Sequence, residues 1–298
     1  MKVLITGGSG LIGGAVTALL LKEGHQVVHI SRHPNQNARV KQYRWDTDRL
    51  EVDTECLSGT DAIINLAGAT LNHRWTADYK SLILRSRVDG TRLLFNTLQA
   101  ESHQVKTLIS ASASGYYPHS YQNIFSEDDA PGNDFMALVC QKWEMEAQNF
   151  ENLGIRTVRG RIGIVLSDED GALPAMAKPV RFGLGAPLGS GRQFMSWIHI
   201  DDLARMFVHA LKNNELSGPY NFVGPEVVSN REMTRAIARV LRKPLFFFFF
   251  PAVALRLALG EMSEIVLRSN GLTNTRISES GFQYEYRKID DALTDLLK

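Results

Sequence analysis

The stretch VLITGGSGLIGGAVTALLLKEGHQVVHISR, residues 3–32, decides the fold of this chain. An apolar run ends at Thr6, the glycines Gly7, Gly10 and Gly13 follow, and a helical pattern then leads into a second apolar run. The first glycine permits a tight turn, the second lets the backbone approach a pyrophosphate, and the third lets the helix pack closely on the strand. The stretch therefore predicts a strand–loop–helix–strand unit that binds a nucleotide.

The predicted helix would present its amino end to that nucleotide. Unpaired N–H groups and the positive end of the helix dipole favour a phosphate at this position. Because the glycines lie between a strand and an amphipathic helix, a merely structural turn is the weaker interpretation. We expect contacts with the dinucleotide from Gly7, Gly8, Ser9, Gly10, Leu11, Ile12 and Gly13.

The second predicted strand ends in Ser31 and Arg32. A site for NAD usually carries an aspartate or glutamate there, which holds the ribose 2′-hydroxyl. A carboxylate would repel a 2′-phosphate, whereas a guanidinium binds it and a hydroxyl can donate to it. The sequence therefore predicts NADP as the cofactor. The alternative is that Arg32 is a solvated arginine at the end of a strand.

The first half of the chain alternates short apolar runs with longer helical patterns. Such alternation predicts βαβ units and a parallel sheet covered by helices on both faces. We expect a doubly wound α/β (Rossmann) domain at 1–245, with a small interleaved lobe at about 166–195 and 223–245, and a C-terminal helical appendage at 246–298. The predicted strands are Lys2–Thr6, Gln26–Ser31, Ala62–Ala67, Lys106–Ser110 and Arg156–Gly160, and the predicted helices are Leu11–Glu23, Tyr79–Gln99 and Asp134–Leu153.

Composition argues against several classes of partner. With 33 basic and 32 acidic residues the formal net charge is +1, which gives no electrostatic basis for binding nucleic acid or an anionic membrane surface. Cys56 and Cys140 show neither a disulfide framework nor a metal-ligand spacing, so we expect no metal and a reducing compartment. We expect a cytoplasmic protein with a small-molecule substrate, no indicated oligomer, and a buried connector in the phenylalanine run 246–250.

Four motifs, in this order, resemble the extended branch of the short-chain dehydrogenase/reductase superfamily. They are TGGSGLIG at 6–13, NLAG at 65–68, the serine-rich strand end at 110–115 and SWIHIDDLA at 196–204. The segments SASASGYY, CQKWEMEA and LRLALGEMSEIVL are similar to its atypical, sugar-nucleotide epimerase-like group with a C-terminal extension, typified by the bacterial cell-division inhibitor homologue. The resemblance covers most of the first 245 residues and implies an NADP-dependent oxidoreductase or epimerase.

The resemblance assigns residues to the adenine side of the cofactor. Ala67 and Gly68 would pass beneath the adenine ribose and the pyrophosphate, and Asp46 would lie near the adenine. Arg74 would contact a phosphate of the cofactor or of the substrate. The alternatives are that Asp46 is a turn residue and that Arg74 is a solvated loop cation.

The resemblance also assigns the nicotinamide end, to Ser110, Ser112 and Arg161. Superfamily chemistry there uses a tyrosine as proton donor and a lysine four residues later, which lowers the pKa of the phenol and holds the ribose. On the predicted helix Lys142 can hold the ribose, but the residue four positions before it is Leu138, which has no proton to give. The usual tyrosine–lysine pair is therefore absent.

Three interpretations of the missing acid stay open. Tyr116 or, by preference, Tyr117 donates the proton from beyond the serine strand. Alternatively, the substrate or water handles the proton beside Ser112. The third interpretation is that no hydride chemistry occurs and the chain is a catalytically silent NADP-binding sensory or scaffold module.

Two further positions bear on the substrate side. Nucleotide-sugar epimerases carry an arginine just before the IHIDD motif, where this chain has Met195, so a sugar nucleotide is disfavoured. His199 is more readily interpreted as a structural histidine than as an acid–base group, and Asp201 and Asp202 are expected to cap the helix that follows.

Overall fold

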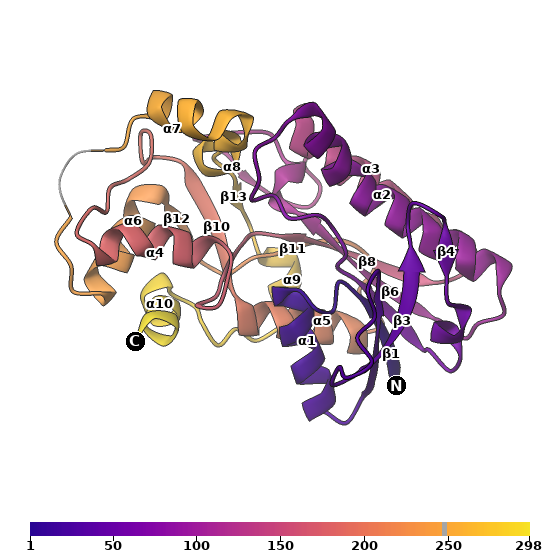
Figure 1. Ribbon diagram of the computed structural model, residues 1–298. Coiled ribbons are helices and arrows are strands. Elements are labelled where there is room, and N and C mark those ends of the chain that lie inside the picture. Colours follow the sequence, from indigo (N-terminus) through magenta and orange to yellow (C-terminus); the bar gives the residue numbers. More distant parts are fainter. Residues whose placement is uncertain (246–248) are drawn as a thin grey trace.

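A parallel sheet forms the centre of the computed structural model, which describes residues 1–245 and 249–298 (Figure 1). Its strand order is β11-β8-β6-β5-β1-β2-β3-β4, and every neighbouring pair is parallel except β3 and β4. The strands of the described residues are β1 (Lys2–Thr6), β2 (Gln26–Ser31), β3 (Lys41–Asp46), β4 (Glu51–Val52), β5 (Ala62–Asn65), β6 (Thr107–Ala113), β7 (Ile124–Phe125), β8 (Arg156–Ile162), β9 (Ile164–Leu166), β10 (Phe194–His199), β11 (Gly218–Phe222), β12 (Val227–Ser229) and β13 (Gly271–Leu272).

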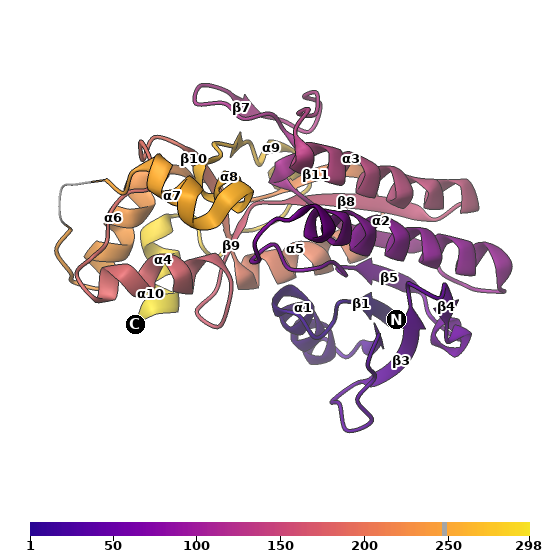
Figure 2. The same cartoon turned by 45° about the horizontal axis from the view of Figure 1, so that its top comes forward.

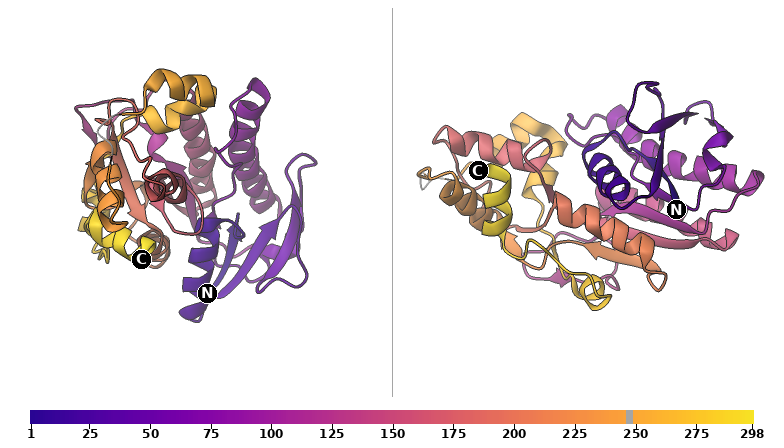
Figure 3. Two further views of the ribbon diagram at one scale, coloured as in Figure 1. Left: turned by 60° about the vertical axis from the view of Figure 1, so that its left-hand side comes forward. Right: turned by 90° about the horizontal axis from the view of Figure 1, so that it is seen from below.

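Helices cover both faces of this sheet. Seen from below, α1 and α5 lie in front of the strands, and α2 and α3 lie behind them (Figure 3, right). The helices of the described residues are α1 (Leu11–Lys22), α2 (Ala77–Ala100), α3 (Phe135–Gln148), α4 (Ala172–Arg181), α5 (Ile200–Lys212), α6 (Asn230–Val240), α7 (Ala252–Leu259), α8 (Ser263–Leu267), α9 (Thr275–Glu279) and α10 (Ile289–Leu297).

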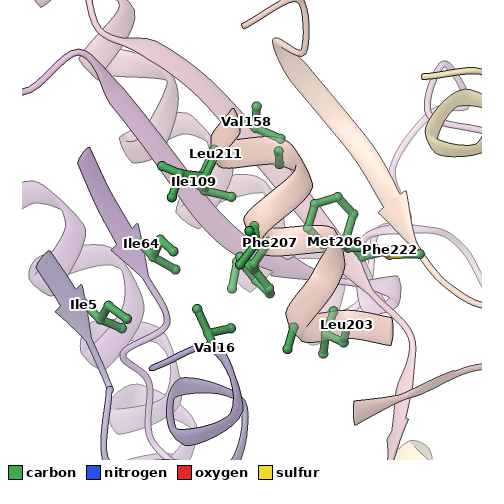
Figure 4. Close-up of a cluster of buried hydrophobic side chains, with 14 of the residues drawn as sticks. Ile5, Val16, Ile64, Ile109, Val158, Leu203, Met206, Phe207, Leu211 and Phe222 are labelled. Atoms are coloured by element: carbon green, nitrogen blue, oxygen red, sulfur yellow. The ribbon is translucent and has the colours of Figure 1, made fainter. Parts of the chain in front are cut away.

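A buried apolar cluster joins the sheet to α1 and α5 (Figure 4). Ile5, Ile64 and Ile109 come from three adjacent strands and pack towards Val16 of α1 and Phe207 of α5. The opposite face of the same strands is also apolar, as is usual for a sheet that helices cover on both sides. The strand order and the two helical layers confirm the predicted doubly wound α/β fold.

Element bounds differ from prediction mainly at the carboxyl edge of the sheet. The strand Gln26–Ser31 is observed as predicted, whereas β6 continues past Ser110 to Ala113 and β8 past Gly160 to Ile162. The predicted helix Asp134–Leu153 is divided, because α3 ends at Gln148 and a 3-10 helix follows. Gly154, with φ 71°, closes that last turn in the left-handed conformation that glycine tolerates.

The small lobe, at the left of Figure 1, has its own sheet and core. Strands β12, β10 and β9 form that sheet. Trp197 of β10 is fully buried against Met233 and Ile237 of α6 and Leu293 of α10. The C-terminal segment therefore shares a core with the lobe.

The phenylalanine run is exposed where the structure describes it. Residues 246–248 lie outside the described residues, whereas Phe249 and Phe250 are 61% and 44% exposed. The backbone of Phe250 pairs with Pro187 and Gly189, so the chain is tied to the neighbouring loop while the ring stays outside. For Phe249 and Phe250 the prediction of a buried connector is wrong.

We expect Phe207→Ala to lower the free energy of unfolding by about 3–5 kcal/mol, because removal of a fully buried ring leaves a cavity. The ring of Phe207 meets that of Phe222 edge-on, with centroids 5.3 Å apart. Met145→Ala, on the exposed side of α3, is the matched control and should change this free energy by less than about 0.5 kcal/mol. Urea unfolding curves measure both changes in free energy, and equal changes in the two variants would show that Phe207 is not part of a closely packed core.

Candidate functional site

The glycine loop after β1 is held against the end of β5. Gly7 has φ 67°, and a Cβ on it would lie 2.9 Å from the carbonyl carbon of Leu66. A Cβ on Gly13 would lie 2.3 Å from the carbonyl oxygen of Gly7. Only glycine fits at these two positions, because any side chain would meet backbone that cannot move aside.

The first turn of α1 faces this loop with no side chain to cap it. Gly10 is the N-cap residue and makes no side-chain hydrogen bond, and the first turn contains no acidic residue. The N–H groups at the start of a helix have no partner within the helix. A backbone cradle that a Cβ would fill, at a helix amino end without a carboxylate, fits a phosphate group.

Buried hydroxyl and amide groups fix the ends of three neighbouring strands. Thr6 of β1 donates to Asn65 of β5 at 2.7 Å and accepts from the backbone of Leu66 and Ala67 at 3.0 Å each. The amide of Asn65 donates in turn to Ser110 of β6 at 3.3 Å. Ala67 and Gly68 therefore follow β5 beside the glycine loop, whereas the side chain of Ser110 is fully buried behind it.

Arg32 stands exposed at the end of β2, and within the described ranges no carboxylate lies within ion-pair distance of it. Ser31 accepts from the backbone of His33 at 3.2 Å, which still leaves its own hydroxyl proton to donate. At the end of β3, Asp46 accepts from the N–H groups of Asp48 and Arg49, both at 3.1 Å. These backbone hydrogen bonds hold the pKa of Asp46 below its usual value. They also show that the carboxylate of Asp46 stabilises the turn between β3 and β4.

The end of β6 leads into a buried polar network. Arg161, 3% exposed on β8, forms a bidentate ion pair with Glu144 of α3 at 2.8 and 2.9 Å. Ser112 donates to the same carboxylate at 2.6 Å. Tyr117 accepts from Arg161 at 2.9 Å and donates to Asn221 at 2.7 Å.

This network is a wall behind the edge of the sheet. Ser112 and Tyr117 are 2% and 0% exposed, and burial raises the pKa of the Tyr117 phenol well above its usual value. The structure thus brings Ser112, Tyr117 and Arg161 together, as expected of site residues, but all three face one another and their buried partners. The guanidinium of Arg161 also lies over the ring of Tyr116, with the guanidinium carbon 3.5 Å from the ring centroid.

The side chains of α3 that face the end of β6 are Met136 and Cys140, whereas the sequence spacing suggests Leu138 and Lys142. A Cβ on Gly115 would lie 3.2 Å from Met136 and 3.7 Å from the sulfur of Cys140. Residues two apart on a helix point about 200° apart, so Leu138 and Lys142 face away, and both are exposed. The structure does not bring Lys142 to this edge, and neither helix register supplies a tyrosine.

Ser114 was missed by sequence reasoning. It follows β6 and is only partly buried. Unlike Ser110 and Ser112, its hydroxyl makes no hydrogen bond to any described residue. Alternation along a strand would place residues 110, 112 and 114 on one face, so only the end of β6 at Ala113, which the sequence did not predict, separates Ser114 from the buried pair.

The C-terminal segment 268–270 holds the turn that follows β6, and no motif pointed to it. Arg268 donates to the carbonyl of Tyr117 and forms an ion pair with Asp134, the N-cap of α3. Asn270 donates to the carbonyls of Ser114 and Tyr117, at 3.3 Å each. The geometry of the serine-rich turn therefore depends on residues far along the chain.

The remaining predicted positions lie around the small lobe. Figure 2 shows α7 and α8 between that lobe and the loop before α2, and an ion pair of 2.7 Å joins Glu261, between α7 and α8, to Lys80 in the first turn of α2. Arg74, exposed in this loop, comes within 3.8 Å of a Cβ placed on Gly260. Met195 is buried in the lobe.

His199 has a structural role at the start of α5. It is fully buried and caps the helix by accepting from the N–H of Asp201 at 3.1 Å. The expectation that Asp201 and Asp202 cap this helix is therefore wrong: both lie in its first turn, and Asp202 is buried and accepts from the backbone of Glu285 and Tyr286. Among the described residues no group of three or more His, Cys, Asp or Glu side chains is arranged to hold a metal ion, and no helix is long and apolar enough to cross a membrane.

A glycine cradle at the carboxyl edge of a parallel sheet, with helices on both faces, defines a Rossmann-like protein. A profile described as the NAD dependent epimerase/dehydratase family matches residues 3–223, and one described as a domain of unknown function, DUF1731, matches residues 250–296. The chain belongs to the NAD dependent epimerase/dehydratase family. It is 37% identical over 297 residues to an epimerase family protein of Staphylococcus saprophyticus, covering 99% of this chain and 98% of that one.

Solved structures agree with this assignment. The human epimerase family protein SDR39U1, crystallised with NADPH, is 31% identical with a TM-score of 0.88 and covers 99% of both chains. A nucleoside-diphosphate sugar epimerase of Corynebacterium glutamicum is 32% identical with a TM-score of 0.81, over 100% of this chain and 58% of that one. The UDP-glucuronic acid 4-epimerase of Bacillus cereus, at 21% identity, a TM-score of 0.80 and coverage of 99% and 98%, shows the fold alone.

Adjacent glycines of α1 provide a matched test of the cradle. We expect Gly13→Ala to displace the loop and abolish or strongly weaken dinucleotide binding, because its Cβ would lie 2.3 Å from the oxygen of Gly7. Gly14→Ala meets nothing within 4 Å and should retain binding while stabilising the helix by up to about 1 kcal/mol. Calorimetric titration and thermal unfolding of both variants measure these effects. Equal binding by the two would show that the close approach is unimportant.

The glycine loop rests on His29, whose ring would come within 2.5 Å of a Cβ on Gly8. Burial lowers the pKa of His29 below 6.5, so the unfolded chain takes up a proton first as the pH falls. The free energy of unfolding should therefore decrease below about pH 6.5. In urea unfolding between pH 7 and pH 5, the free energy of unfolding of His29→Gln should decrease less steeply than that of the parent. Parallel pH dependences of the two free energies would refute this contribution of His29.

Proposed function

We propose that this chain binds NADP(H) along the carboxyl edge of its sheet. The observation that carries the proposal is an open glycine cradle combined with Arg32 at the end of β2, an exposed cation with no carboxylate partner among the described residues. With the pyrophosphate at the start of α1, the adenosine half extends over β2, where Arg32 is placed to bind a 2′-phosphate. The presence of NADPH in the human relative, 31% identical over nearly the whole chain, supports the same choice.

The reaction we infer is an oxidoreductase or epimerase step on a small polar substrate. Bound NADP(H) would supply or accept the hydride. Ser114 is placed to donate to a substrate oxygen, because its hydroxyl, just past the end of β6, has no hydrogen-bond partner in the part of the chain that the structure describes. Ser112 and Tyr117 would act indirectly, by holding the wall from which Ser114 projects.

A second function, NADP binding without catalysis, is favoured by the side chains that α3 presents. Met136 cannot transfer a proton, and burial raises the pKa of Cys140 to about 12, so neither replaces an acidic tyrosine near neutral pH. A sensory or scaffold module would need only the cradle and Arg32.

Turnover distinguishes the two functions. NADPH oxidation is followed with the purified protein across a panel of small aldehydes, ketones and keto acids, after calorimetry has shown that NADPH binds. Oxidation that is lost in Ser114→Ala and retained in Lys142→Ala supports the enzyme. Saturable NADPH binding with no oxidation across the panel refutes the oxidoreductase step and is the result expected of the binding module.

Arg32→Ala tests the choice of cofactor. Loss of a charge-assisted contact should weaken NADPH binding by about tenfold or more while NADH binding changes little. Arg235→Ala removes an exposed arginine from α6 in the small lobe and serves as the control, with no expected change for either cofactor. Equal loss of NADPH and NADH affinity in Arg32→Ala would exclude a role in binding the 2′-phosphate.

A further inference from the structure

Large apolar side chains are exposed together at one end of the small lobe. The loop after α4 and the residues from 249 to the end of α7 meet there, at the left of Figure 1. Exposed patches of this kind mark sites that contact a protein or a membrane. We call the following six side chains, which are 44% to 79% exposed, the apolar face: Phe182, Leu184, Phe249, Phe250, Val253 and Leu257.

Backbone hydrogen bonds place the two segments side by side. The N–H of Phe250 donates to the carbonyl of Pro187 at 2.9 Å, and its own carbonyl accepts from Gly189 at 2.8 Å. Nearer α4, a Cβ on Gly185 would lie 2.8 Å from the side chain of Leu245. The loop after α4 therefore contacts the chain both before and after residues 246–248, so the exposed side chains of the two segments lie at the same end of the lobe.

Helix α7 extends the apolar face. Leu255 is the buried residue of this helix, whereas Val253 and Leu257 are exposed and lie one turn apart on the same side. Arg256 is exposed next to Leu257, and the helix contains no acidic residue. This short helix thus presents apolar and basic groups together.

The same part of the lobe is strongly basic. Residues 171–200 and 233–260 contain eight of the 33 basic residues of the chain and none of its 32 acidic residues. Of these eight, only Arg239 has an ion-pair partner among the described residues, and that partner is Asp290. The net charge of +1, which argued against an anionic membrane surface, therefore conceals a local excess of positive charge. All eight are exposed: Lys178, Arg181, Arg192, Arg235, Arg239, Arg242, Lys243 and Arg256.

Several of these cations border the apolar face. Lys178 and Arg181 lie in the last turn of α4 and line one cavity together with Phe182. Arg242 and Lys243 follow the end of α6. Aromatic and aliphatic groups with a basic border complement a surface that is apolar within and negatively charged outside.

An anionic bilayer fits this surface better than a second copy of the chain or a nucleic acid. Two copies related by a two-fold axis would place the same cations against one another. A nucleic acid would contact the cations but has no use for aliphatic groups such as Leu184 and Val253. A bilayer satisfies both parts, because its phosphates attract the cations and its acyl chains accept the apolar side chains.

We propose that this end of the small lobe docks on an anionic lipid bilayer, with the apolar face at the boundary between head groups and acyl chains and the cations against lipid phosphates. The contact is peripheral, because none of the described helices is long and apolar enough to cross a membrane. Helix α1, whose amino end borders the glycine cradle, lies away from this end of the molecule (Figure 1), so docking leaves the cradle open. The inference is independent of the proposed function.

Vesicle flotation tests the charged part of this contact. The purified protein is mixed with vesicles of phosphatidylcholine alone, or of phosphatidylcholine and phosphatidylglycerol in equal parts. We expect binding to the anionic vesicles only, weakened about tenfold or more in the double variant Arg242→Ala/Lys243→Ala, because each cation near the surface adds to the attraction. The matched control Lys22→Ala/Lys106→Ala removes the same charge from exposed lysines outside the lobe and should bind like the parent.

A second pair of variants tests the apolar part. Phe182→Ser/Leu257→Ser should weaken binding to the anionic vesicles about tenfold or more, because less apolar area leaves water. The matched control Leu82→Ser/Met145→Ser changes exposed side chains of α2 and α3 and should bind like the parent. Thermal unfolding shows that each variant is folded.

Other outcomes would overturn the proposal. It is wrong if the parent does not bind the anionic vesicles, or if the variants of the lobe bind them as tightly as the controls. Loss of binding in Arg242→Ala/Lys243→Ala alone would refute insertion of the apolar face. A DNA duplex that binds as tightly as the vesicles, with no loss in Phe182→Ser/Leu257→Ser, would assign the surface to nucleic acid instead. Should a lobe variant not fold, hydrogen exchange of the parent decides: anionic vesicles should protect residues 182–189 and 249–257.

Discussion

The contact between the glycine loop and the end of β5 is the constraint on which the rest of this structure depends. Two strands of a parallel sheet diverge at their ends unless something joins them, and here Thr6 joins them by bonding to Asn65 and to the backbone of Leu66 and Ala67. Gly7 then turns within van der Waals contact of Leu66. The amino end of α1 is thereby placed over the centre of the sheet, so its open N–H groups face the crevice at the sheet's carboxyl edge.

The two arginines near this edge illustrate opposite uses of one side chain. Arg161 is paired within the protein: Glu144 balances its charge, and Ser112 and Tyr117 complete the buried network around it. Arg87 of α2 keeps unused donors, and among the described residues no carboxylate lies within ion-pair distance of it. The ion pair of Arg161 fixes the shape of the buried network, whereas a cation with unused donors retains the capacity to bind a ligand. Sequence position alone does not distinguish them, because the partners of Arg161 come from α3 and from the turn after β6, far from it in the chain.

Local patterns predicted the fold and the cradle, since glycine spacing and apolar alternation act over a few residues. The orientation of side chains around α3 was beyond such patterns, because a shift of two residues rotates the helix by more than half a turn and exchanges Lys142 for Cys140. The burial of Ser112 and Tyr117 likewise depends on partners from α3, β8 and β11. Arg268 and Asn270 act through backbone carbonyls of a distant turn and leave no signature in sequence.

The tie between Arg268 and Tyr117 spans 151 positions of the chain. During synthesis, the ribosome releases the glycine loop, β5 and β6 long before it releases this arginine. The strands of the amino-terminal half can therefore begin to pair while the turn bearing Ser114 is still unanchored. Synthesis order thus separates formation of the glycine loop from the fixing of this turn, which awaits translation of Arg268 and Asn270.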